Sequence, residues 1–126
     1  MSEQVGAALR DVLPPECVVT DPDLLAGYRS DRAMFCEAGD PAVAVLARET
    51  AQVVATMGVA SRLGVPVVPQ GARSGLSGGA NAIDGCIVLS LERMDRVLEI
   101  DTANRLVVTE AGVDNATLSR AVAEQG

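Results

Sequence analysis

Lysine, histidine and tryptophan are absent from this sequence, and the only aromatic residues are Tyr28 and Phe35. All ten basic residues are therefore arginines, and the formal net charge is −7. Nucleic acids and anionic membranes are bound mainly through clustered positive charge. The acidic balance thus argues against both of these partners.

Long apolar runs are also missing, and no stretch of the sequence is long enough to span a bilayer. Residues 1–10 have neither a basic leader nor the apolar run of a secretory signal. We therefore expect a cytoplasmic protein. The three cysteines, Cys17, Cys36 and Cys86, are an odd number with wide spacing, which fits neither a disulfide framework nor a close-spaced zinc site. This pattern predicts reduced, packed thiols and no metal centre.

Aliphatic residues dominate what is present. Hydrophobic residues make up 48% of the 126 residues, a length that corresponds to one small domain or to part of one. Because aromatic residues are so scarce, the core must be built from Val, Leu, Ile and Ala. A core of this kind is typical of strands covered by helices.

Helical spacing of apolar residues predicts a first helix that begins at Ser2, as its cap, and ends before Pro14. A second, short helical turn is expected from Asp21 to Ala26. The next strong signal is the run at 42–47, which is short, apolar and β-branched at alternate positions, and which therefore predicts a buried strand.

A helix is expected after this strand, with Thr50 as its cap and Gly64 as a left-handed stop. Its predicted apolar face comprises Val53, Val54, Met57 and Ala60.

Residues 65–69 predict a second strand, which is parallel to the first because a strand, a helix and a strand in this order form a crossover. Pro66 favours the end of a strand or an edge strand, because proline cannot donate a backbone hydrogen bond. Another strand is expected at 87–91. The pair 97–100 and 106–109 predicts an antiparallel hairpin, and a last helix is expected to begin at Asn115 as its cap. The fold class predicted is therefore α+β, with a small parallel β-α-β unit followed by antiparallel strands.

The glycine-rich loop at 70–79 is the most informative segment. Dense glycine allows positive φ and lets successive backbone N–H groups converge on one anion, so a phosphate or pyrophosphate is the natural ligand. We expect Arg73 to be able to add a charge-assisted hydrogen bond. An isolated glycine cluster is equally often a plain surface loop, but tight placement between two apolar runs favours a ligand.

Two common phosphate loops do not fit these residues. A nucleoside-triphosphate P-loop needs a terminal lysine, which this chain lacks. A dinucleotide-binding Gly-x-Gly-x-x-Gly motif needs glycine where Arg73 stands, and needs a helix where residues 81–91 predict a turn and a strand.

Five motifs in order resemble one family. They are Pro69-Gln70-Gly71, the run 74–80 (SGLSGGA), Val88-Leu89-Ser90-Leu91, the run 93–101 (RMDRVLEID), and Glu110-Ala111-Gly112-Val113. Together they are similar to the FAD-linked oxidases of the vanillyl-alcohol oxidase type, with a PCMH-type FAD-binding domain. Within these, the chain resembles the branch of glycolate oxidase subunits, D-lactate dehydrogenases and D-2-hydroxyglutarate dehydrogenases.

This resemblance implies that the chain corresponds to the amino-terminal part of such a domain, with FAD as cofactor. Residues 1–41 would be a lead-in segment with an amino-terminal helix. Residues 42–126 would be a partial FAD-binding domain, with the second half and the substrate domain absent. Arg73 and Ser74 stand where many relatives have glycine, asparagine or threonine. The cofactor-binding residues that the resemblance implies are Gln70, Gly71, Ala72, Arg73, Ser74, Gly75, Leu76, Gly78 and Gly79.

The reaction implied by the resemblance is hydride transfer from a 2-hydroxy acid, such as glycolate or D-lactate, to FAD. In relatives the base and the carboxylate pocket come from a later substrate domain with histidines, so no catalytic residue is assigned here. The second glycine-rich stretch that completes the flavin site in relatives is also lacking. We therefore expect the chain alone not to be catalytically competent.

A second hypothesis is a non-catalytic module that binds a phosphate or nucleotide, or that docks onto a partner. The partner would be a complementary chain or a second copy, and it would cover strands that are otherwise left exposed.

Overall fold

Strands β2 (Val43–Leu46) and β4 (Ile87–Ser90) form the centre of the structure, a computed structural model that describes residues 1–126. Every residue of both strands is buried. They pair in parallel, with Val43 opposite Ile87. Strand β3 (Val67–Gln70) pairs in parallel with the other side of β4, and β1 (Val18–Val19) pairs antiparallel with β2. The sheet order is therefore β1-β2-β4-β3.

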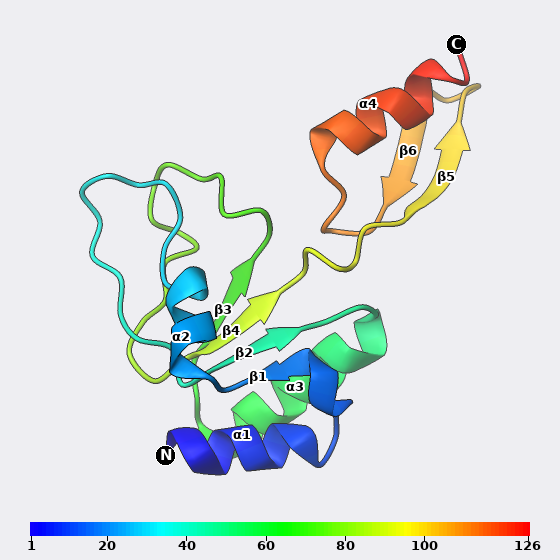
Figure 1. The fold of residues 1–126 in the computed structure, drawn as a ribbon. Helices are drawn as coiled ribbons and strands as arrows, with labels where there is room; N and C mark the ends of the chain where they lie inside the picture. Colours follow the sequence, from blue (N-terminus) through cyan, green and yellow to red (C-terminus); the bar gives the residue numbers. More distant parts are fainter.

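Helices α1 (Ser2–Arg10) and α3 (Thr50–Leu63) cover one face of this sheet (Figure 1). Val5 and Leu9 of α1 share one core cluster with Val59 of α3 and with alternate strand residues such as Val43. Full burial of each such side chain is worth roughly 1.5–3 kcal/mol. Helix α1 thus supplies part of the core that underlies the sheet.

The opposite face of the sheet carries a smaller core. Ala44, Val68 and Val88 pack there against Leu25 of the short helix α2 (Pro22–Leu25). Asp21 caps α2, because its side chain accepts a hydrogen bond from the backbone N–H of Asp23. The short helical turn expected from the sequence is thus confirmed. Two 3₁₀ turns complete this region, Pro15–Cys17 (η1) and Ala26–Tyr28 (η2).

Three predicted helix caps are wrong by one position. Met1, Glu49 and Asp114 occupy the caps, and the predicted Ser2, Thr50 and Asn115 are the first helical residues. Of these three, only Asp114 makes a capping hydrogen bond, to the N–H of Thr117. Cap positions depend on where the backbone leaves extended geometry, which a hydrophobic pattern locates only to within a residue or two.

The buried face of α3 is also rotated from the predicted one. Thr56, Val59 and Ala60 are buried, whereas Val54 and Met57 are exposed. The hydroxyl of Thr56 is satisfied by donating to the carbonyl of Gln52, 2.8 Å away, which allows a polar side chain on this face. Gly64 ends the helix with φ of 65°, as predicted.

Both β2 and β3 are parallel to β4, which lies between them, so the predicted parallel relation is confirmed although the two strands are not neighbours. β3 is an edge strand, as Pro66 indicated. A parallel neighbour cannot be reached by a tight turn. The chain therefore needs the long excursion 71–86 to return from the end of β3 to the start of β4.

Strands β5 (Val97–Asp101) and β6 (Leu106–Thr109) form an antiparallel hairpin, with α4 (Asn115–Ala123) against it. This unit projects away from the main sheet (Figure 1). The hairpin and the fold class predicted from the sequence are both confirmed. None of the helices combines the length and the apolar character that crossing a membrane requires.

Candidate functional site

Two long segments lie side by side beyond the end of β3, residues 27–40 and the glycine-rich residues 71–80 (Figure 1). The first precedes β2 and the second follows β3. Several hydrogen bonds join them, so the shape of the glycine-rich loop depends on a segment about forty residues earlier in the chain.

Buried amide side chains stand at both ends of the loop. Gln70, which precedes it, donates from Nε2 to the carbonyl oxygens of Tyr28 at 2.7 Å and Ala80 at 2.8 Å. Asn81, which follows it, accepts from the N–H of Asp31 at 2.8 Å and donates to the carbonyl of Glu37 at 3.0 Å. These contacts close the base of the loop and fix it to the 27–40 segment.

Further contacts run along the loop. The N–H of Arg32 donates to the carbonyl of Gly75 at 2.9 Å. The thiol of Cys36 lies 3.8 Å from the carbonyl oxygen of Ser77. Gly78 has φ of 76°, and a Cβ there would approach the Cβ of Cys36 to 2.9 Å. The 27–40 segment therefore binds carbonyl groups of the loop and leaves no room for a side chain at Gly78.

The backbone N–H groups of the loop are free. None of those from Gly71 through Ala80 donates a hydrogen bond within the protein, and most of these residues are exposed. The loop is thus polarised, with carbonyl groups engaged by the neighbouring segment and N–H groups available. A run of free N–H groups suits an anion with many acceptor oxygens, and the pyrophosphate of a nucleotide cofactor meets this requirement.

Arg73 already has partners within the protein. Its Nη1 donates to the carbonyl of Gly27, and its guanidinium lies 5.1 Å from the centroid of the Tyr28 ring. Glu92 is 3.9 Å from its Nη2. A cation over an aromatic ring is worth about 0.5–1 kcal/mol at such a site. Arg73 also has positive φ, 53°, which glycine would adopt without strain.

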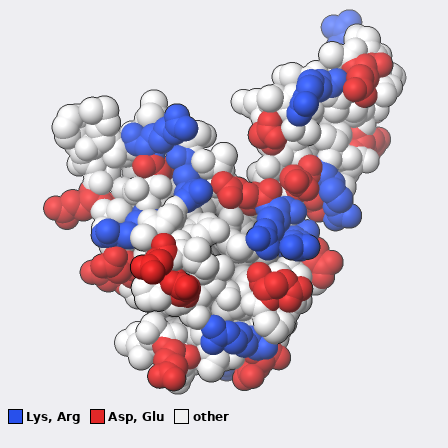
Figure 2. Space-filling view, viewed as in Figure 1, with Lys and Arg blue, Asp and Glu red and all other residues white.

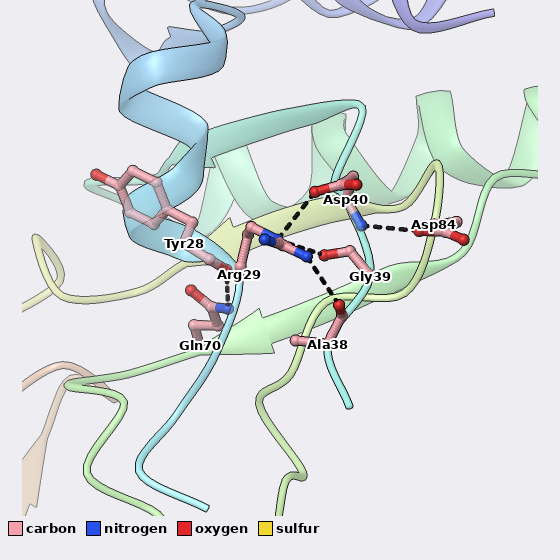
Figure 3. Close-up of polar contacts among 7 residues, drawn as sticks. All are labelled: Tyr28, Arg29, Ala38, Gly39, Asp40, Gln70 and Asp84. Atoms are coloured by element: carbon pink, nitrogen blue, oxygen red, sulfur yellow. Dashed lines mark hydrogen bonds and ion pairs between the residues drawn. The ribbon is translucent and has the colours of Figure 1, made fainter. Parts of the chain in front are cut away.

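Arg29 organises the base of the 27–40 segment (Figure 3). Its Nη2 donates to the carbonyl of Ala38 at 3.1 Å, and its Nε lies 2.9 Å from a carboxylate oxygen of Asp40. Asp84 accepts from the N–H of Asp40 at 2.8 Å, which joins this turn to the end of the 71–86 excursion. Because the ion pair is exposed, its own contribution is below about 1 kcal/mol, and its role is to position the backbone.

Titratable groups with shifted pKa values lie away from the loop. Burial raises the pKa of the Cys86 thiol, which favours the unreactive protonated form. Cys17 and Cys86 are buried, as predicted, but Cys36 is exposed, so the prediction of a packed thiol is wrong there. The neighbours of Cys36 along the chain, Phe35 and Glu37, are exposed as well. The structure contains no cluster of three or more His, Cys, Asp or Glu side chains that would bind a metal.

Charge is scattered in small groups of both signs over the visible face (Figure 2). One hollow of the surface lies between β5–β6 and α4, where Asp101, Arg105 and Val122 line it. That hollow contains none of the residues predicted to bind a cofactor. The glycine-rich loop presents an open surface of N–H groups.

The predicted cofactor residues from Gly71 to Gly79 all lie in this loop, and Gln70 is the last residue of β3. Gln70 is buried and directs its amide to protein carbonyls, so its side chain supports the loop from beneath; its Oε1 accepts no hydrogen bond. Asn81 and the 27–40 segment were not predicted as supports of the loop. A polar residue immediately after the loop was the available signal for Asn81, whereas the 27–40 contacts are long-range and left no local signal.

Relatives in sequence share this part of the chain. GlcD, a glycolate oxidase subunit of Escherichia coli K12, is 35% identical over 113 residues, which are 90% of this chain and 20% of that protein. A D-lactate dehydrogenase of Anaerostipes hadrus is 31% identical over 117 residues, 93% of this chain and 24% of that protein. The chain thus spans about a quarter of the length of curated relatives that it matches.

The fold is shared with solved structures. A substrate-bound p-cresol methylhydroxylase superposes with a TM-score of 0.83 at 22% identity, over 98% of this chain and 24% of that one. This confirms the PCMH-type fold predicted from the sequence. Residues 41–126 match the family described as "FAD binding domain", whose cofactor is the dinucleotide that the free N–H groups suit. The chain therefore belongs to the FAD binding domain family of FAD-linked oxidoreductases.

Proposed function

We propose that the chain binds the pyrophosphate of FAD through the backbone N–H groups of residues 71–79, within an oxidoreductase that transfers a hydride from a 2-hydroxy acid to FAD. One observation carries the binding part of this proposal: no N–H group from Gly71 through Ala80 is used inside the protein. Amides that are already oriented, exposed and unpaired bind an anion at little further cost in ordering.

The substrate class rests on the relatives. Similar proteins include a glycolate oxidase subunit, a D-lactate dehydrogenase and a D-2-hydroxyglutarate dehydrogenase. Each of these names contains a 2-hydroxy acid. When bound, FAD would supply the hydride acceptor. The residues of this chain would hold and orient it, and we propose no catalytic residue among them.

Among the predicted residues we assign direct contacts to the backbone of Gly71, Ala72, Arg73, Ser74 and Gly75. Leu76, Gly78 and Gly79 would close the loop beside the cofactor. The Gln70 side chain would not contact the cofactor but would support the loop, through its hydrogen bonds to the carbonyl oxygens of Tyr28 and Ala80.

Titration of the 126-residue chain with FAD, ADP and riboflavin tests the proposal. We expect FAD and ADP to compete for one site and riboflavin, which lacks the pyrophosphate, to bind much more weakly. Ala72→Pro removes one backbone N–H group of the loop, and the preceding residue, Gly71, tolerates a proline after it. We expect this variant to bind both FAD and ADP about tenfold more weakly. Ala72→Ser keeps the N–H and is the matched control. Riboflavin binding as tightly as FAD would contradict the proposal.

Turnover is tested separately. We propose that these 126 residues alone do not oxidise glycolate, D-lactate or D-2-hydroxyglutarate in the presence of an artificial electron acceptor. Reduction of the acceptor at a rate proportional to the chain concentration would contradict this part and leave the binding proposal intact.

A docking module is the alternative that one observation favours. Leu98, Leu106 and Val108 of the β5–β6 hairpin are exposed apolar residues, and the hairpin has no further strand beside it. A second copy or a complementary chain would cover them. Sedimentation of the chain over a range of concentrations tests this, because a monomer throughout excludes self-association.

Two predictions from the sequence stay proposals here. Division at residue 41 is tested by expressing residues 42–126, which we expect to be less stable because they lack Val5 and Leu9 of the core. Location in the cytoplasm is tested by cell fractionation.

A further inference from the structure

Two residues of the glycine-rich loop have positive φ, Arg73 at 53° and Gly78 at 76°. Glycine adopts this conformation freely, whereas it is uncommon for an arginine. A non-glycine residue stays in it only where surrounding contacts enforce it, and such residues cluster at ligand clamps and active sites. Contacts of Arg73 must therefore hold its backbone in this conformation.

The side chain of Arg73 makes contacts of this kind outside the loop. Its Nη1 donates to the carbonyl of Gly27, and its guanidinium lies 5.1 Å from the centroid of the Tyr28 ring. Its Nη2 lies 3.9 Å from a carboxylate oxygen of Glu92, in the connection that follows β4. Only 29% of the side chain is exposed, although the residues on either side of it are exposed. The side chain thus fastens the middle of the loop to two other segments of the chain.

We propose that Arg73 is a positioning residue for the anion, which acts through its contacts with Gly27 and Tyr28 and not by donating to the phosphates. This inference rests on the proposed function, because it takes the pyrophosphate to lie on the N–H groups of residues 71–79. Positive φ within a turn directs successive N–H groups toward one hollow, which is how backbone nests bind anions. By holding that conformation, the Arg73 side chain orients the neighbouring N–H groups before the ligand arrives, which lowers the cost of binding.

The existing partners of the guanidinium favour this role over direct contact with a phosphate. A guanidinium that left them would break the cation–π contact with Tyr28 and would take away the donor of the Gly27 carbonyl. It would also remove the contacts that compensate for the positive φ of Arg73. The other positive-φ residue, Gly78, is held against the same 27–40 segment, by Cys36. Both turning points of the loop are therefore fixed to residues 27–40.

Titration of two variants with FAD and with ADP tests the inference. Arg73→Gly removes the side-chain contacts without straining the backbone, and we expect about tenfold weaker binding of both ligands. Tyr28→Leu removes the ring without changing a charge and should weaken both ligands about threefold. Tyr28→Phe keeps the face of the ring and should recover most of that loss. The double variant Arg73→Gly/Tyr28→Leu should bind no more weakly than Arg73→Gly, because both changes remove the same contact.

Backbone order parameters of the ligand-free chain give a second readout. We expect the N–H groups of residues 71–79 to lie near the rigid value of about 0.85 and to fall toward about 0.6 in Arg73→Gly, with β2 and β4 unchanged. Arg105→Gly is the matched control, because Arg105 also has positive φ, 55°, but lies at an exposed position between β5 and β6. It should alter neither the order parameters of the loop nor the binding of FAD and ADP.

Arg73→Lys separates positioning from direct contact. Lysine keeps the charge but lacks the planar fork of the guanidinium, so we expect it to bind FAD and ADP as weakly as Arg73→Gly. Wild-type affinity in Arg73→Lys, or tighter binding in Tyr28→Leu, would mean that the charge contacts the phosphates and would overturn the inference. Unchanged binding or unchanged order parameters in Arg73→Gly would also overturn it and leave the proposed function intact. A wild-type chain that binds neither FAD nor ADP overturns the proposed function and the role of Arg73 in binding together.

Discussion

The side-chain amide of Gln70 donates a 2.7 Å hydrogen bond to the carbonyl oxygen of Tyr28, 42 positions earlier in the chain. The same nitrogen donates to the carbonyl of Ala80 at 2.8 Å. One buried amide thus joins the end of β3, the far end of the glycine-rich loop and the 27–40 segment. The free N–H groups of the loop are held in place from this point.

Gln70→Met is expected to destabilise the fold by about 2–4 kcal/mol, because the carbonyls of Tyr28 and Ala80 would each lose a donor. Methionine keeps nearly the same volume, so the effect reports hydrogen bonding and not a cavity. Urea unfolding followed by circular dichroism measures it. Gln4→Met, at an exposed position of α1, is the control and should change stability by less than about 0.5 kcal/mol.

Gly78→Ala is expected to cost about 1–2 kcal/mol and to weaken FAD binding. Its φ is 76°, and the new Cβ would lie 2.9 Å from the Cβ of Cys36. Gly79→Ala is the matched control, because no atom lies within 4 Å of a Cβ there and its φ is not positive. Equal effects of the two variants on unfolding and on FAD titration would show that the contact with Cys36 does not determine the loop shape.

Gly112→Ala should be severely destabilising, by more than about 2 kcal/mol, because its Cβ would overlap the carbonyl oxygen of Leu91. Gly112 is where the chain leaving β6 passes the chain leaving β4. Gly58→Ala in the middle of α3 has open space around the new Cβ and should stabilise by about 1 kcal/mol. Opposite signs of the two changes in the denaturation midpoint are the expected result, and destabilisation by both would contradict it.

Acidification should loosen the β5–β6–α4 unit before the central sheet. The hydrogen bond and charge of Arg96 lower the pKa of the Glu110 carboxyl, and hydrogen bonds from Thr117 lower the pKa of Asp114. A carboxyl whose pKa is lowered on folding adds stability at pH above its ordinary pKa. That stability is lost as the pH falls through the lowered pKa.

Amide hydrogen exchange as a function of pH, corrected for intrinsic rates, measures this effect in β5 and β6 against β2 and β4. Glu110→Gln removes the carboxyl that pairs with Arg96 at 2.7 Å and should flatten part of the pH dependence. Unchanged pH dependence in this variant would assign the effect to other carboxyl groups, such as Asp101 and Asp114.

Much of the element order could be predicted from the residues. The run 42–47 and the helix stop at Gly64 depend on local hydrophobic pattern and on the conformational freedom of one glycine, and both predictions hold. The N-caps of α1, α3 and α4 and the exposure of Cys36 were predicted wrongly. Those features depend on where the backbone of each segment meets its neighbours, which local pattern does not specify.

By itself, the sequence determined the types of the main elements and the presence of a glycine-rich loop suited to an anion. Both depend on properties of single segments, namely the spacing of hydrophobic residues and the density of glycine. Only the tertiary structure decided that β4 lies between β2 and β3, and that residues 27–40 engage the carbonyl groups of the loop while its N–H groups stay free. Both depend on contacts between residues some forty positions apart, such as Tyr28 with Gln70 and Cys36 with Gly78. Such contacts form only when the whole chain has folded.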